Sequence, residues 1–195
     1  MTTSSRPNAA VAVWARRRLL ALAAALPASS GALAGFNFFT SEYSASRDEL
    51  QAQIGKRFPV QQRYAELFTV GLRDPQLGLD ARANRAALTA VLTISSPLLQ
   101  PTSVQGIVSV SSALKYDPVA LALRLDQPRA ERIEMQGVGG RDAERLQQIG
   151  AVVTQELLRD YPLHTFKPQE LTVGRKTYEI GAITVQDTAI TVQLK

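Results

Sequence analysis

The side chains that could perform chemistry are few in this sequence and far apart. His164 is the only histidine and there is no cysteine, which excludes metal sites built from several imidazoles or from thiolates. A Ser-His-Asp triad would have to use His164, yet the chain contains no G-x-S-x-G nucleophile elbow. We therefore expect His164 to be a strand or loop residue. The sequence predicts no catalytic residue, no metal site and no cofactor.

The carboxylates and glycines give no stronger evidence of a catalytic or binding site than His164 does. Paired acid-base catalysis needs two carboxylates facing one cleft. Asp74, Asp117 and Asp126 instead lie beside or near prolines, where an Asp side chain bonds the local backbone of a turn. The G-V-G-G stretch at 137–140 lacks the third glycine of a phosphate-binding loop, and we interpret it as a lead-in to a helix. We therefore predict a protein that is not an enzyme.

The elements that would position these residues are mostly strands. Apolar and polar residues alternate over 86–95, 103–112 and 119–126. Turn signals separate the alternating segments at Asp74-Pro75, Asn84, 97–101, 116–118 and Gln127-Pro128. Short strands at this spacing predict an antiparallel meander over residues 65–136. Gly71, Gly78 and Gly106 indicate places where the sheet bends or bulges.

Two segments have a helical period instead. Ser46 and Glu49 have the spacing of a capping box and predict a helix of about ten residues that stops before Pro59. A later apolar stripe continues over about five turns and consists of Ala143, Leu146, Ile149, Val153 and Leu157. Alternation returns over 178–194. We therefore predict an α+β fold, in which a bent antiparallel β-sheet wraps around a long helix in the C-terminal half, with a short N-terminal helix.

The first 34 residues have the pattern of a secretory signal peptide. An arginine cluster at 16–18 precedes the apolar run 19–26, and Ala32-Leu33-Ala34 supplies the small residues that a signal peptidase reads. The apolar run is shorter than the roughly 18 to 20 residues that span a bilayer. We expect cleavage between Ala34 and Gly35, an N-terminal arm over 35–45, and one domain over 46–195. The alternative is an N-terminal anchor that is not cleaved.

Removal of this leader changes the charge of the protein. The whole chain has 22 basic and 17 acidic residues, a net charge of +5, but four of the arginines and none of the acids lie in residues 1–34. Residues 35–195 therefore carry 18 basic and 17 acidic side chains, a net charge of +1. A nucleic-acid binder concentrates basic residues on its folded part. We therefore expect no nucleic-acid partner.

A set of short motifs occurs along the chain in a characteristic order. The motifs are Arg57-Phe58-Pro59, Asp74-Pro75, Asn84-Arg85, Tyr116-Asp117-Pro118, Asp126 with Pro128, and Tyr161-Pro162. In this respect the chain resembles the YceB-like bacterial envelope lipoproteins over residues 46–195. The resemblance implies a fold similar to tubular lipid-binding domains and a place in the cell envelope. It implies no enzyme activity.

One feature departs from that family. Its members carry a lipid anchor on a cysteine directly after a sequence such as Leu33-Ala34-Gly35, where this chain has Phe36. Because the chain has no cysteine, we expect no covalent lipid anchor and a soluble periplasmic protein after cleavage.

These observations give one functional hypothesis and one alternative. The hypothesis is a non-enzymatic periplasmic protein that holds or carries an apolar ligand, a lipid or fatty acyl chain, between sheet and helix. The residues expected to line that interior are Leu92, Val108, Leu121, Leu123, Ile149 and Val153. The alternative is an envelope interaction or assembly module with a filled core, no ligand, and an envelope protein as its partner.

Overall fold

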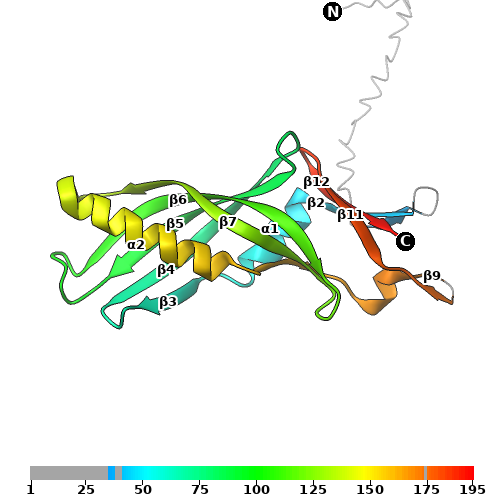
Figure 1. Cartoon of the computed structure of the whole chain (residues 1–195), viewed down its shortest axis with the longest axis horizontal. Helices are drawn as coiled ribbons and strands as arrows, with labels where there is room; N and C mark the ends of the chain where they lie inside the picture. The colour runs from blue at the N-terminus through cyan, green and yellow to red at the C-terminus, as the bar shows by residue number, and fades with distance from the viewer. Residues whose placement is uncertain (1–34, 38–40, 174) are drawn as a thin grey trace, which may run out of the picture. The chain divides into compact units, whose positions relative to one another are not determined.

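The computed structural model describes residues 35–37, 41–173 and 175–195 (Figure 1). The expected signal peptide, including Ala34, lies outside these residues, and Gly35 is the first residue of a strand. The helices are α1 (Arg47–Gly55), α2 (Gly140–Leu158) and the 3-10 helix η1 (Pro168–Leu171). The strands are β1 (Gly35–Asn37), β2 (Glu42–Ser46), β3 (Val60–Tyr64), β4 (Phe68–Asp80), β5 (Arg85–Ser95), β6 (Ser103–Asp117), β7 (Ala122–Met135), β8 (Pro162–Thr165), β9 (Thr172–Val173), β10 (Lys176–Thr177), β11 (Ile180–Val185) and β12 (Ala189–Leu194).

Six of these strands form one curled sheet in the order β3-β4-β5-β6-β7-β8. Every neighbouring pair in this sheet is antiparallel. The sheet curls like half a barrel, and α2 packs against it, in contact with β7 and with β3, β4 and β5 (Figure 1). The predicted α+β class and the antiparallel meander are therefore confirmed.

A second sheet, in the order β1-β2-β12-β11, lies beside the far end of the first. The alternation over 178–194 therefore does form strands, and the N-terminal arm contributes β1 and β2 to the same sheet. Asn84, in the β4–β5 turn, connects the two sheets. Its Oδ1 accepts a hydrogen bond from the Val185 N–H at 2.7 Å, and its Nδ2 donates to the Ile183 carbonyl at 3.3 Å.

Helix α1 begins with both hydrogen bonds of a capping box. The Ser46 Oγ accepts from the Glu49 N–H at 3.4 Å, and a Glu49 carboxylate oxygen accepts from the Ser46 N–H at 3.1 Å. Leu50 and Ile54 are buried beneath the helix. These contacts fix where α1 starts and which face it presents to the sheet.

Two expected turns are instead irregularities within continuous strands. Strand β4 runs through Asp74-Pro75 with a shift of register between Arg73 and Gln76, and β7 likewise runs through Gln127-Pro128. A proline has no N–H to donate, so it is tolerated where a bulge releases one residue from the ladder. In β4 the side chain of Gln51 from α1 bonds the released backbone, donating to the Pro75 carbonyl at 2.7 Å and accepting from the Leu77 N–H at 2.6 Å.

The glycines predicted to bend the sheet have different roles. Gly71 and Gly78 flank the β4 bulge, and a Cβ at either position would make only ordinary contacts. A Cβ at Gly106 would lie 2.3 Å from the Glu134 carbonyl oxygen, so this position needs glycine because β7 approaches closely.

The buried face of α2 is rotated from the predicted stripe. Its buried residues are Leu146, Gly150, Val153, Thr154 and Leu158, whereas Ala143, Ile149 and Leu157 are only half-buried. Gly150 accounts for the rotation, because a Cβ there would lie 2.8 Å from Leu92 Cδ2 and 3.5 Å from Ile133 Cδ1. The helix backbone therefore rests directly on the side chains of the sheet.

We expect Gly150→Leu to lower the free energy of unfolding by about 1–3 kcal/mol, because the new side chain overpacks the contact with Leu92. Urea unfolding followed by circular dichroism measures this change. The matched control is Gly55→Leu, since a Cβ at Gly55 meets no atom within 4 Å. An unchanged midpoint for Gly150→Leu would contradict the close approach of α2.

Candidate functional site

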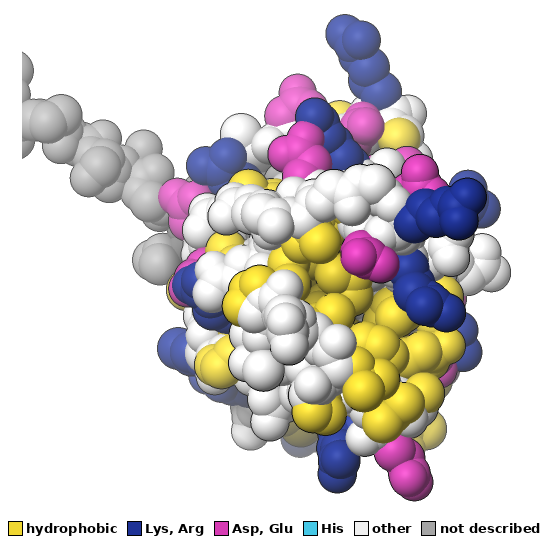
Figure 2. Space-filling model, turned by 90° about the vertical axis from the view of Figure 1, so that its left-hand side faces the viewer, with side chains coloured by type: hydrophobic (Ala, Val, Ile, Leu, Met, Phe, Trp, Pro, Cys, Tyr) yellow, Lys and Arg dark blue, Asp and Glu magenta, His cyan; other side chains and the backbone are white. Residues whose placement is uncertain are grey.

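One end of the curled sheet is open and contains a pocket of about 460 Å³. This end, here called the mouth, is bounded by the β3–β4 turn (65–67), the β5–β6 loop (96–102), the β7–α2 connection (136–139) and the first turns of α2. It lies on the left in Figure 1 and faces the viewer in Figure 2, where hydrophobic side chains gather around a hollow. The pocket in it is called the mouth pocket below.

The mouth pocket is apolar at its base and mixed at its rim. Its apolar side chains are Phe68, Pro97, Leu98, Leu99, Pro101, Val104, Val138 and Leu146. Val104 and Leu146 are buried and form the base, whereas Leu98 is 68% exposed at the rim. Gln100, Asp142 and Arg145 are the polar side chains of the rim. The volume of the mouth pocket lies within the roughly 300–1,000 Å³ of small-molecule clefts, and polar and apolar atoms contribute about equally to its lining.

The two loops at the mouth have defined shapes. The β5–β6 loop is closed by the Ser96 N–H, which donates to the Thr102 carbonyl at 2.9 Å. The G-V-G-G stretch connects β7 to α2, as expected of a lead-in, and α2 begins at Gly140. Gly137 and Gly140 have φ angles of +72° and +62°, which other residues rarely adopt. The backbone of this connection therefore depends on these two glycines.

The six residues predicted to line a ligand site lie outside the mouth pocket, and the structure does not bring all six together at one place. Leu92, Val108, Leu123 and Val153 are buried in the core, and Leu121 and Ile149 pack against it half-buried. None of the six lines the mouth pocket.

The six also divide between two regions. Leu92 and Val108 lie on neighbouring strands near α2, whereas Leu123 pairs with Tyr116 and His164 near the other end of β6. Because α2 rests directly on Leu92, an acyl chain beside Leu92 would require the helix to move away. The role of these six residues in ligand binding stays a prediction.

The sequence pattern does not single out the residues of the mouth pocket. The segment Pro97-Leu98-Leu99-Gln100-Pro101 by itself indicates only a turn. Its two adjacent leucines between prolines were the available clue, because turns seldom place two large apolar residues side by side without a partner.

His164 lies in β8 and is held on both ring nitrogens. Its Nδ1 is 2.9 Å from Gln53 Nε2 and its Nε2 is 3.3 Å from the Tyr43 hydroxyl. With the Gln53 amide donating to Nδ1, the imidazole is neutral and its Nε2–H donates to Tyr43. Phe166 packs against the ring at a centroid distance of 4.6 Å. His164 thus joins α1, β2 and β8 and has no nitrogen free to activate a nucleophile.

Burial lowers the pKa of His164, and the nearby carboxylates of Glu170 and Glu49 oppose this shift only in part. The neutral form is therefore the one that the fold accommodates.

The three turn carboxylates make local contacts. Asp117 accepts the backbone N–H groups of Val119 and Ala120 at 3.0 and 3.1 Å, as expected for a turn, and these bonds lower its pKa. Asp74 and Asp126 differ from the expectation, since their contacts are ion pairs with Arg73 and Lys115. In each case a basic side chain projects next to the carboxylate from the same strand or the neighbouring one. Within the described residues, no cluster of three or more His, Asp or Glu side chains is placed to hold a metal ion.

Comparison with known proteins adds no relative. No protein-family model matches the chain, and no curated protein matches it. Among the described residues, no helix is both long and apolar enough to cross a membrane. The function must therefore be inferred from the residues and their geometry.

We expect the protein to lose stability as the pH falls below about 6.5, the usual pKa of histidine. Because the folded-state pKa of His164 is lower, the unfolded chain takes up a proton in this window that the folded chain does not, and acid favours unfolding. Urea midpoints between pH 7 and pH 5 measure the effect. His164→Gln should flatten this dependence, since the chain has no other histidine. An equally steep dependence in that variant would assign the effect to other groups.

Proposed function

We propose that this protein is a non-enzymatic binder or carrier of an apolar ligand, a lipid acyl chain, in the bacterial periplasm. The observation that carries this proposal is the mouth pocket, whose apolar base opens to solvent at the end of the curled sheet. Its volume of about 460 Å³ falls within the range of small-ligand sites. The ligand's polar end would remain at the rim, near Gln100, Asp142 and Arg145.

The apolar contacts of such a site set an upper limit on its affinity for an acyl chain. Each methylene removed from water contributes about 0.8 kcal/mol. Burial of about ten methylenes would therefore give about 8 kcal/mol, which corresponds to a dissociation constant of about 1 μM before the cost of ordering the chain. The net affinity is lower than this limit by the cost of ordering the chain.

Two features of the sequence support the same proposal. The resemblance to the YceB-like envelope lipoproteins brings with it the tubular lipid-binding arrangement, a bent sheet around a long helix with a short helix near the N-terminus. The leader pattern of residues 1–34 supports a location outside the cytoplasm. Without a cysteine to acylate, the protein would be soluble in the periplasm after cleavage at Ala34-Gly35, or retained there by an uncleaved N-terminal anchor.

The packing of α2 favours a second candidate, an envelope interaction or assembly module. At Gly150 the helix and the sheet are already in contact, so this part of the interior has no space for a chain. On this alternative the core is filled, the mouth pocket holds no lipid, and the protein acts by contacting an envelope protein.

Native and denaturing mass spectra of the protein purified from a bacterial periplasm distinguish the two candidates. Extra mass that is present natively, is lost on denaturation, and extracts as a lipid would support the carrier and identify its cargo. A clean apo mass, with no uptake of added fatty acid or phospholipid, would favour the interaction module. The denatured mass also tests the leader, since it should match a chain that begins at Gly35.

We expect Leu99→Asp to weaken the binding of an apolar probe such as N-phenyl-1-naphthylamine by about tenfold or more, because it places a charge in the wall of the mouth pocket. Leu99 is only half-buried, so the fold should tolerate the change. The matched control is Val152→Asp on the exposed face of α2, outside the pocket. Probe fluorescence during titration gives both affinities. Equal affinities for the two variants would place the binding site elsewhere.

A further inference from the structure

Exposed apolar side chains concentrate at the mouth. Among the described residues the large apolar side chains that remain exposed are Tyr64, Leu67, Leu98, Ile107, Val119 and Val152. Leu98, Leu67 and Tyr64 are 68%, 48% and 39% exposed, and all three lie at or beside the loops of the mouth. The other three are scattered over β6, the β6–β7 hairpin and the outer face of α2. Clustered exposed apolar groups mark interaction sites, whereas single ones do not.

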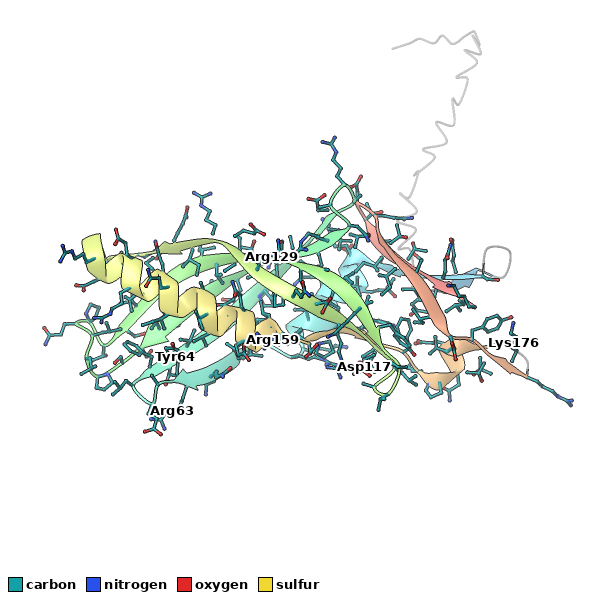
Figure 3. All side chains as sticks on the ribbon, viewed as in Figure 1. Arg63, Tyr64, Asp117, Arg129, Arg159 and Lys176 are labelled. Carbon is teal, nitrogen blue, oxygen red and sulfur yellow. The ribbon has the colours of Figure 1, made fainter. Side chains whose placement is uncertain are left out.

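Strand pairing places these three side chains on neighbouring tips. Tyr64 pairs with Phe68 across the β3–β4 turn that carries Leu67. Thr69, the next residue of β4, pairs with Ser95, directly before the loop that carries Leu98. In Figure 3, Tyr64 and Asp117 lie toward opposite ends of the sheet. Tyr64, Leu67 and Leu98 are called the apolar tips below.

The apolar tips are continuous with the mouth pocket. Leu98 lines the pocket itself, and Phe68, next to Leu67, forms part of its wall. Figure 2 shows hydrophobic side chains leading from the outer surface of this end into the hollow. An acyl chain held at the tips could therefore pass into the pocket without crossing water.

Charges around the mouth are balanced. Three basic and three acidic exposed side chains lie on the β3–β4 turn with the adjoining end of β3 and on the first turns of α2: Arg63, Glu66, Arg141, Asp142, Glu144 and Arg145. The β5–β6 loop has no charged residue. A balanced rim neither concentrates anionic lipid nor repels it. Contact through this end would depend on apolar insertion rather than on electrostatic attraction.

We propose that the apolar tips insert into the surface of a lipid bilayer, so that the mouth pocket exchanges its chain directly with the membrane. This inference rests on the proposed function of the mouth pocket. A fluid bilayer suits side chains that project from separate loop tips, because it adapts to their shape, whereas a stable protein interface needs a complementary surface of roughly 800 Å² on each partner. The amphipathic ring of Tyr64 suits the boundary between headgroups and acyl chains.

The test compares vesicle binding of the full chain with that of a Tyr64→Ser, Leu67→Ser double variant. Neither residue lines the mouth pocket, so probe uptake should be unchanged. Cosedimentation with vesicles of phosphatidylethanolamine and phosphatidylglycerol should fall about tenfold or more, because two apolar side chains no longer insert. Val119→Ser is the matched control, since Val119 is 94% exposed at the β6–β7 hairpin, away from the mouth. All these proteins share the same N-terminal segment, so any difference between them arises at the tips.

Two results would overturn the inference. One is equal vesicle binding by the double variant and the parent, whatever their probe uptake. The other is binding that high salt abolishes, because balanced charges predict little dependence on salt. Leu99→Asp separates the two activities. If this variant no longer binds the probe but binds vesicles as the parent does, membrane contact is independent of ligand binding in the pocket. If the pocket takes up no probe in any protein, the proposed function fails and the exchange of a chain fails with it, and vesicle binding then tests only the insertion of the apolar tips.

A second measurement needs no loss-of-function variant. Because the chain contains no cysteine, Leu98→Cys can carry a single polarity-sensitive dye. Its emission should shift to shorter wavelength on addition of the same vesicles, and lipids with a quencher in the acyl region should quench it. Val119→Cys with the same dye should show neither change. A dye at position 98 that stays in water would contradict insertion.

Discussion

The approach of α2 to the sheet at Gly150 is the contact on which the rest of the structure depends. A single missing side chain lets the helix backbone rest on Leu92 and Ile133. With helix and sheet in contact there, the middle of the interior is filled by side chains. Space for a ligand is left at the end, where α2 begins and the loops extend beyond the sheet. The mouth pocket lies away from this close contact, at the end where α2 begins.

Irregularities in the strands curve the six-stranded sheet. Polar side chains beside them connect this sheet to α1 and to the second sheet. The bulge at Asp74-Pro75 releases backbone groups that Gln51 binds, so the same irregularity that bends β4 also fixes α1. Asn84 uses a side-chain amide in the same way, bonding the backbone of β11 and joining the second sheet to the first. In each case a polar side chain satisfies main-chain groups that a regular ladder would have paired.

Several polar side chains of the described residues are engaged in contacts that hold the fold together. His164 has both ring nitrogens occupied by Gln53 and Tyr43, and Asp117 is saturated by its own turn and by Arg124. The mouth offers apolar side chains to a ligand or a partner. The proposed binding of an apolar chain and the proposed contact with a membrane would both use that surface.

The sequence by itself determined the features that depend only on residues close to one another along the chain. Alternation of apolar and polar residues gave the meander, the Ser46–Glu49 spacing marked the capping box, and the single histidine excluded whole classes of chemistry. Only the tertiary structure decided which face of α2 is buried, because that depends on Leu92, which is 58 residues away from Gly150 in sequence. It also decided that Pro75 and Pro128 lie within bulges, since a turn and a bulge use the same residue types and differ only in where the neighbouring strand pairs. The mouth pocket needed the ends of several separate segments to converge, and no local pattern records such a convergence.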